Sequence, residues 1–153
     1  MKNCFYVALN LLILTATAQQ PLRLHPRNPH YFEFRGKPTV LVTSAEHYGA
    51  VLNPDFDFKT YLDELARHGL NYTRIFSGSY VEAPGLGDFS IPNNTLGPKP
   101  ERFLAPWART SQPGYHRGGP KFDLSKWDPA YFSRLKSFVQ EAGKRGIVVE
   151  MTF

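Results

Sequence analysis

The spacing of hydrophobic residues between positions 55 and 76 predicts a helix followed directly by a strand. Four of these residues recur at i, i+3, i+4 and i+7 and so share one helical face: Phe58, Tyr61, Leu62 and Leu65. Asp55 or Asp57 can cap the start of this helix, and Gly69 can end it. The β-prone run 70–76, "LNYTRIF", follows at once, and Arg74 is its only charged residue.

The same order recurs nearer the end of the chain. Asp128 can cap a second helix, Pro129 suits its first position, and Gly146 can end it before a predicted strand at 147–153. The predicted apolar stripe of this helix consists of Phe132, Leu135, Val139 and Ala142. Gly69 and Gly146 lie 77 residues apart, and the two units align without a gap. A repeated order of helix, glycine and strand predicts an α/β fold with a parallel sheet.

Short alternating runs precede the first of these units. Turn signals at 28–29 and 35–38 predict a small β-hairpin within an N-terminal segment, 19–38. The hairpin should lead into a strand at 39–43, where Val40, Leu41 and Val42 form an unbroken apolar run. Such a run is typical of a strand covered on both faces. The predicted α/β domain therefore covers 39–153.

A long segment, 77–125, separates the two helix–strand units. It contains 49 residues, with seven prolines and seven glycines, and its composition predicts a loop. The loop leaves the carboxyl end of a strand, where α/β folds place their sites. It also carries many aromatic residues, of which Tyr80, Trp107 and Tyr115 are the best candidates for binding a ligand.

The first eighteen residues have a different pattern. Lys2 precedes an apolar run at 4–16, and small residues at 16–18 follow it. This layout is typical of a secretory signal peptide covering 1–18, and the apolar run is short for a membrane span. An uncleaved membrane anchor is the alternative. Cys4 is the only cysteine, so a cleaved chain would contain no disulfide, which fits an exported bacterial protein in the periplasm or outside the cell.

Cleavage is expected after Ala18, because the small-residue triplet ends there. Mass spectrometry of the exported protein should find Gln19 at the new N-terminus. An intact Met1 in the mature product would instead support the membrane anchor.

Charge and histidine spacing narrow the classes of partner. The formal net charge is +5, and the basic residues are scattered rather than clustered into a stripe, so we expect no nucleic-acid partner. No histidine has the spacing of a metal ligand, and we expect neither a metal nor a cofactor. After signal cleavage we also expect no membrane association. The oligomeric state stays open.

Arg74 needs an anionic partner if its strand is buried in a sheet. Three stretches around and beyond it together resemble the N-terminal third of secreted clan A glycoside hydrolases, the cellulase-like (β/α)8 barrels related to family 5: "PRNPHYFEFRGKPTVLVTSAEHYG", "YLDELARHGLNYTRIFSGSY" and "FDLSKWDPAYFSRLKSFVQEAGKRGIVVEMTF". The resemblance implies a partial TIM barrel, its first three strands and two helices, preceded by a short β-hairpin. Gly69, Asn71 and Arg74 match the family's "GxNxxR" pattern, whose arginine holds the nucleophilic glutamate.

The resemblance also implies a retaining mechanism with two catalytic glutamates, one after strand four and one on strand seven. Neither position maps onto this chain, which ends at the third predicted strand. We therefore expect an N-terminal fragment of an exported glycoside hydrolase acting on poly- or oligosaccharides, inactive by itself. Two alternatives stay open: a non-catalytic carbohydrate-binding or scaffold remnant of a TIM barrel, and a different (β/α)8 enzyme.

The predicted substrate-binding residues lie near the carboxyl ends of the expected strands or in the long loop: Glu46, His47, Tyr48, Arg74, Tyr80, Glu82, Trp107 and Tyr115. Each has a structural alternative. Glu46 could cap a turn, Glu82 could be a solvated loop acid, and the loop aromatics could form a local core. Arg74 could form a structural ion pair, and Glu150 on the next predicted strand could supply the acid. Trp127 is predicted to be a packing residue.

Overall fold

A computed structural model describes residues 21–43, 46–76, 81, 94–115 and 117–152. The predicted signal peptide at 1–18 lies outside this range, as do the candidates Tyr80 and Glu82. The chain divides into two compact units, Met1–Val40 and Leu41–Phe153. Each unit is described separately below.

The described part of the first unit is a small antiparallel sheet of three strands, β1 (Arg23–Leu24), β2 (Phe32–Phe34) and β3 (Lys37–Thr39), in that order. The turn between β2 and β3 has positive φ angles at Arg35 (51°) and Gly36 (73°), as tight two-residue hairpin turns require. Arg23 and Glu33 face each other across β1 and β2 and form an ion pair.

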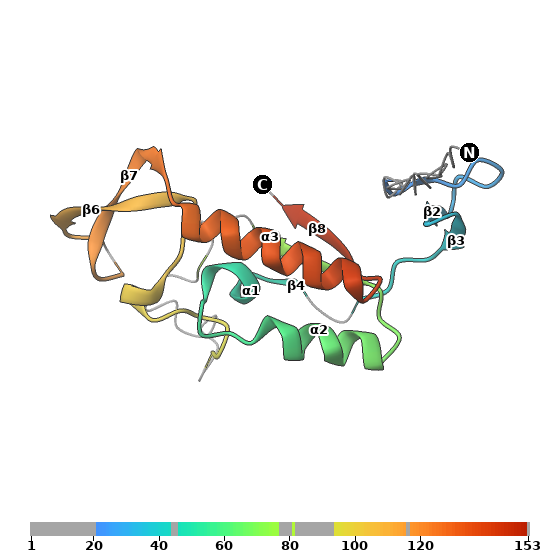
Figure 1. Cartoon of the computed structure of the whole chain (residues 1–153), viewed down its shortest axis with the longest axis horizontal. Helices are drawn as coiled ribbons and strands as arrows, with labels where there is room; N and C mark the ends of the chain where they lie inside the picture. Colours follow the sequence, from blue (N-terminus) through green and yellow to red (C-terminus); the bar gives the residue numbers. More distant parts are fainter. Residues whose placement is uncertain (1–20, 44–45, 77–80, 82–93, 116, 153) are drawn as a thin grey trace, which may run out of the picture. The chain divides into compact units, whose positions relative to one another are not determined.

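The second unit contains a parallel sheet with helices between its strands (Figure 1). Its strands are β4 (Glu46–His47), β5 (Tyr72–Phe76) and β8 (Val148–Thr152), in that order, and all pairs are parallel. The helices are α1 (Gly49–Leu52), α2 (Phe58–Arg67) and α3 (Pro129–Lys144). The fold is therefore mixed α/β, as predicted, and its described strands form no closed barrel.

The predicted strand at 39–43 is wrong. Thr39 ends β3, residues 40–43 form no strand, and the side chains of Val40 and Val42 are 57% and 46% exposed. The edge of the parallel sheet is β4, a few residues later. Val42 is instead fixed by Asn71: its N–H donates to Asn71 Oδ1 at 2.8 Å, and its carbonyl accepts from the Asn71 N–H at 3.1 Å. Two hydrogen bonds to Asn71, one to its side-chain amide and one from its backbone N–H, thus replace the strand pairing that was expected for this segment.

The segment 77–125 contains more regular structure than its composition predicts. A 3-10 turn covers Pro100–Arg102, and β6 (Trp107–Pro113) pairs antiparallel with β7 (Pro120–Trp127). The pairing is irregular, with register shifts after Trp107 and after Arg109. A hairpin is usually predicted from alternating apolar and polar residues. Here that pattern is interrupted by the register shifts and by proline at one end of each strand.

Both helices of the repeated units begin and end as predicted. The Asp57 carboxylate caps α2 by accepting from the N–H groups of Lys59 and Thr60, at 3.0 and 3.1 Å. Asp128 caps α3 in the same way, with Pro129 at the first position. Gly69 and Gly146 each follow a helix with φ of +72°, a conformation that suits glycine.

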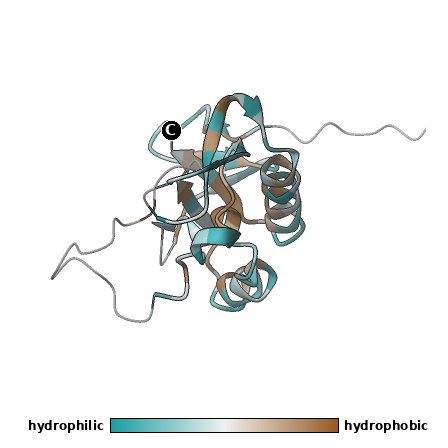
Figure 2. Cartoon of the chain, turned by 90° about the vertical axis from the view of Figure 1, so that its left-hand side faces the viewer, coloured by the Kyte–Doolittle hydropathy of each residue, from teal (hydrophilic) through white to brown (hydrophobic). Residues whose placement is uncertain are grey.

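The core lies between the sheet and the helices (Figure 2). The predicted stripe of α3 is partly right, since Leu135 and Ala142 face the core, but Phe132 and Val139 do not. Tyr131, Phe138 and Ala142 are buried, whereas Phe132 and Val139 are 42% and 44% exposed. Only Ala142 of the predicted stripe is fully buried. Two stripes of similar spacing exist on this helix, and contacts such as the edge-to-face packing of Phe58 and Phe138 (5.5 Å between centroids) decide between them.

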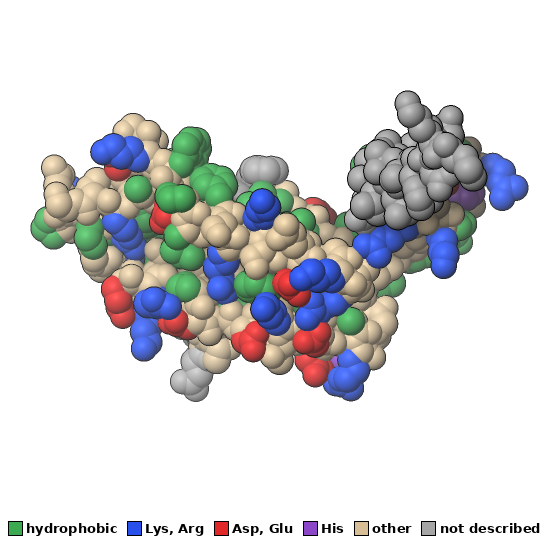
Figure 3. Space-filling view, in the orientation of Figure 1, with side chains coloured by type: hydrophobic (Ala, Val, Ile, Leu, Met, Phe, Trp, Pro, Cys, Tyr) green, Lys and Arg blue, Asp and Glu red, His purple; other side chains and the backbone are tan. Residues whose placement is uncertain are grey.

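Acidic and basic side chains are interspersed over the outer surfaces of α2 and α3 (Figure 3). Arg145, just after α3, links the two helices, since its Nε lies 2.7 Å from Asp63 on α2 and its Nη1 lies 2.8 Å from Glu141 on α3. None of the helices in the described part of the chain is long and apolar enough to cross a membrane.

Candidate functional site

Arg74 lies on the face of the parallel sheet opposite the helices. Along β5 the side chains alternate, so Thr73 and Ile75 are buried against the helices while Tyr72, Arg74 and Phe76 lie on the other face and are partly exposed. Glu46 on β4 and Glu150 on β8 are the two register neighbours of Arg74. The register therefore places a basic residue, Arg74, between two acidic residues, Glu46 and Glu150, across three neighbouring strands.

The described partner of Arg74 is Glu150. Arg74 Nε lies 3.0 Å from Glu150 Oε1, and the Tyr72 hydroxyl donates to Glu150 Oε2. The two side chains of the ion pair are 41% and 44% exposed. The arginine is thus less buried than the apolar strand sequence suggested, and its acid comes from the neighbouring strand.

The surroundings of Glu150 favour its ionised form. The hydrogen bond from Tyr72 lowers the pKa of the Glu150 carboxyl most, and the positive charge of Arg74 lowers it further. Burial and the nearby carboxylate in turn raise the pKa of Tyr72 above its ordinary value, so the phenol stays a donor. At neutral pH Glu150 is therefore a carboxylate that accepts from Tyr72 and forms an ion pair with Arg74, and it is not a proton donor.

His47 and Tyr48 do not join this row. His47 is the register neighbour of Ile75, and its ring is 4% exposed and packs against Tyr61 at 4.5 Å and Phe56 at 5.3 Å. Within the described residues neither ring nitrogen has a hydrogen-bond partner. Tyr48 is 3% exposed, and its hydroxyl accepts from Asn94 Nδ2 at 2.8 Å. Both side chains lie in the core cluster or against it.

Burial of His47 should make the stability of the fold depend on pH. Desolvation lowers the pKa of its imidazole from 6.5 to about 4. As the pH falls from 8 to 5, His47 therefore becomes protonated in the unfolded chain but stays neutral in the folded chain. The free energy of unfolding falls by about 2 kcal/mol as a result. His47→Phe should flatten the pH dependence of urea unfolding by that amount.

The control for this measurement is the same substitution at His30, whose side chain is exposed and not packed in the core. Carboxylates contribute equally to the pH dependence of the parent chain, His47→Phe and His30→Phe. The contribution of His47 is therefore the difference in pH dependence between His47→Phe and the other two proteins. Parallel stability curves for the parent chain and His47→Phe between pH 8 and pH 5 would contradict a neutral, buried His47.

The loop aromatics divide into two groups. Tyr115 packs with Phe103 and Phe122, with ring centroids 6.1 and 5.1 Å away, and the guanidinium of Arg109 lies 3.9 Å from the centre of the Phe122 ring. This group is a local core beside the β6–β7 hairpin, the structural alternative considered for Tyr115. Trp107 belongs to a second group, in which it stacks on Trp127.

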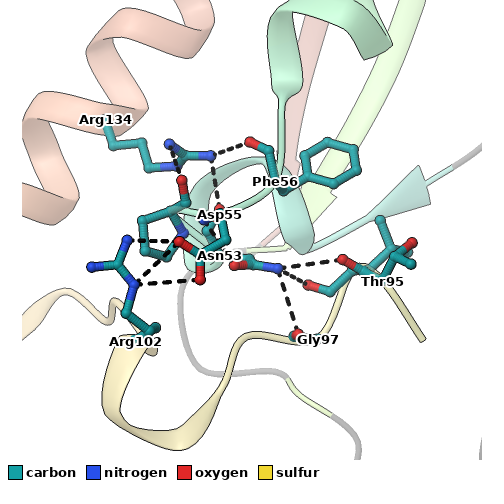
Figure 4. Close-up of polar contacts among 9 residues, drawn as sticks. Asn53, Asp55, Phe56, Thr95, Gly97, Arg102 and Arg134 are labelled. Atoms are coloured by element: carbon teal, nitrogen blue, oxygen red, sulfur yellow. Dashed lines mark hydrogen bonds and ion pairs between the residues drawn. The ribbon is translucent and has the colours of Figure 1, made fainter. Parts of the chain in front are cut away.

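A polar network that the sequence did not indicate holds the segment after β4 (Figure 4). Arg134 on α3 donates to the carbonyls of Ala50, Asn53 and Phe56, at 2.9, 2.8 and 2.7 Å. The Asn53 amide in turn lies within 3.4 Å of three carbonyls in the segment 95–97. Arg134 lies between Ser133 and Leu135, outside the predicted apolar stripe, and an arginine at such a position resembles a solvated helix residue. No local pattern therefore marks it.

A cavity of about 280 Å³ lies beside this network, lined by Arg134 and by residues 54–59. None of the predicted binding residues lines it. Within the described residues no group of three His, Cys, Asp or Glu side chains could hold a metal ion. The side chain of Glu46 lies outside the described part of the structure, so only its register position beside Arg74 is defined.

Comparison with solved structures identifies a similar fold. The crystal structure of a candidate glycoside hydrolase from Bacteroides vulgatus matches 80% of this chain with a TM-score of 0.53 and 15% sequence identity. The match covers 22% of that protein, so this chain spans about a fifth of its length. No family model and no curated protein matches the chain. At this identity the likeness shows a shared fold and nothing further.

Proposed function

We propose that the second unit forms the first three strands and two helices of a (β/α)8 barrel in an exported glycoside hydrolase that acts on poly- or oligosaccharides. The row of Glu46, Arg74 and Glu150 across three parallel strands is the observation that carries this proposal. The fold shared with the candidate glycoside hydrolase and the family resemblance of the sequence support it. The apolar run that follows Lys2 supports export.

Arg74 would hold the nucleophilic carboxylate of a retaining mechanism. A guanidinium can bind two carboxylates through different edges of its planar fork. Glu150, together with Tyr72, would fix Arg74 from one side. A second carboxylate, brought by a later strand of the barrel, would be kept ionised by the same positive charge. Glu46, Tyr80 and Glu82 are the predicted residues that we retain as sugar contacts, whereas His47, Tyr48 and Tyr115 would support the site by packing.

The described residues offer no acid/base pair of their own. Glu150 is ionised and engaged by Arg74 and Tyr72, so it would not donate a proton to a leaving group. The catalytic glutamates would therefore come from elsewhere in the barrel. If the chain acts without them, carbohydrate binding without hydrolysis is the second candidate function.

The decisive experiment is to sequence the gene beyond the codon for Phe153 and to assay its complete product on aryl glycosides and polysaccharides. The proposal expects an Asn-Glu pair after a fourth strand, a later strand-borne Glu, and products that keep the anomeric configuration of the substrate by NMR. Inversion would refute the retaining mechanism. Binding of polysaccharide without turnover would favour the second candidate, and neither binding nor turnover would refute both.

A further inference from the structure

We propose that Trp127, backed by Trp107, is a binding platform for a neutral polysaccharide chain. The choice of ligand class rests on the proposed function. The sequence pointed to Trp107 as the sugar contact and to Trp127 as a packing residue. Their exposure favours Trp127 as the contact residue, because Trp107 is partly buried against the core whereas Trp127 is 66% exposed.

The platform is flat and supported. The two indoles stack with centroids 6.5 Å apart and planes 18° from parallel, and their residues are register neighbours on β6 and β7. Phe132 packs edge-on against Trp127 at 5.7 Å, which limits rotation of the outer ring. Trp127 thus presents a fixed aromatic face, at the place where hydrophobic side chains gather between β7 and the start of α3 (Figure 3).

The residues around the ring fit a neutral, hydroxyl-rich ligand. A pyranose can bury its C–H groups on an aromatic face while its hydroxyls bond to polar neighbours. Asp123, Ser125 and Lys126 precede Trp127 on β7 and are the polar side chains nearest to it along that strand. Their charges are balanced, since Asp123 lies 3.5 Å from Lys126 Nζ and accepts from the Ser125 hydroxyl at 2.6 Å. The Asp123–Lys126 pair adds no net charge to this part of the strand, which suits a neutral ligand.

The size of the platform also favours a sugar over a protein. A stable protein interface buries on the order of 800 Å² on each partner, whereas one sugar ring needs a single aromatic face. The location agrees with a substrate subsite. Because β8 runs back alongside α3, the start of α3 lies at the carboxyl edge of the parallel sheet (Figure 1), the edge where α/β folds bind ligands.

The test uses the fact that Trp107 and Trp127 are the only tryptophans of the chain. Tryptophan emission of the full chain should shift saturably with soluble xylan, mixed-linkage β-glucan or galactomannan. Affinity electrophoresis in the same polysaccharides should show binding about tenfold weaker for Trp127→Ala, the value expected for loss of one aromatic stack. Trp127→Tyr should retain part of the affinity, which separates a binding role from misfolding.

Leu124→Ala is the matched control, because Leu124 lies on the same strand, is 72% exposed and has no aromatic face. Its affinity should equal that of the parent chain. Three results would overturn the platform: no shift with any of the polysaccharides, equal losses in Trp127→Ala and Leu124→Ala, or an emission shift that follows protein concentration alone and accompanies dimer formation.

The platform and the proposed function can fail separately. A complete gene product that hydrolyses polysaccharide while Trp127→Ala binds as the parent does would overturn the platform alone. Binding through Trp127 without any turnover by the complete product would overturn the hydrolase and leave the platform intact.

Discussion

Replacing Arg134 with methionine is expected to lower the free energy of unfolding by about 3 kcal/mol. Its guanidinium donates to three carbonyls of the segment between β4 and α2 at 2.9 Å or less, and it lies 4.9 Å from the centre of the Phe58 ring. Methionine keeps the hydrophobic stem but removes the charged donor from all three carbonyls. The carbonyls of Asn53 and Phe56 each keep a backbone N–H donor, at 3.1 and 3.0 Å. Because Arg134 is only partly buried, water would recover some of the loss, and we therefore expect less than the sum of the separate bonds.

Urea denaturation of the chain measures this effect, and Arg102→Met is its matched control. Arg102 belongs to the same network (Figure 4) but meets Asp55 at 2.7 Å with both side chains about half exposed. An exposed ion pair contributes about 1 kcal/mol or less. Equal losses in the two variants would contradict the special role of Arg134. Arg134→Lys should lose nearly as much as Arg134→Met, because one ammonium cannot reproduce the planar fork.

The sequence predicted best those features that depend on neighbouring residues alone. Asp57, Asp128, Gly69 and Gly146 all act where they were expected, since a cap bonds to N–H groups two or three residues away and a left-handed turn needs only its own glycine. The parallel order of the strands followed from the repetition of helix, glycine and strand. Local chemistry was sufficient for these elements.

Features that depend on distant partners were predicted poorly. The predicted stripe on α3 was right for Leu135 and Ala142 and wrong for Phe132 and Val139. Tyr131 and Phe138 have equivalent spacing, and tertiary packing, such as that of Phe138 against Phe58, selects them. The strand at 39–43 was favoured by β-branched residues, yet the sheet edge formed at Glu46–His47. Intrinsic propensity is a weak guide when tertiary contacts decide.

In the candidate site, too, features set by neighbouring residues were predicted and features set by distant partners were not. A lone arginine in a β-prone run correctly raised the question of an acidic partner for Arg74. Choosing among the acids required the structure. The register places both Glu46 and Glu150 beside Arg74, and the ion pair at 3.0 Å forms with Glu150. The composition of the segment 77–125 likewise predicted a loop, and it indicated neither the β6–β7 pairing nor the exposure of Trp127.

Arg74→Met in the complete gene product should lower kcat by about 100-fold or more and change KM little. This expectation rests on the proposed function, in which the guanidinium stabilises charge mainly in the transition state. Arg74 lies in the middle strand of the parallel sheet, on the face opposite the helices, where the later strands of a barrel would close over it. The kcat of Arg74→Lys should lie between those of the parent enzyme and Arg74→Met, because lysine keeps the positive charge but lacks the planar guanidinium.

A pH profile separates this role from a purely structural one. Without Arg74 the pKa of the nucleophilic carboxyl should rise, and the acid limb of kcat/KM should move to higher pH. Arg23→Met is the matched control, since Arg23 and Glu33 form the same kind of cross-strand arginine–glutamate pair in the first unit. It should leave kcat and the pH profile unchanged. Parental turnover in Arg74→Met with only a shifted KM would mean that Arg74 binds sugar and does not support the nucleophile.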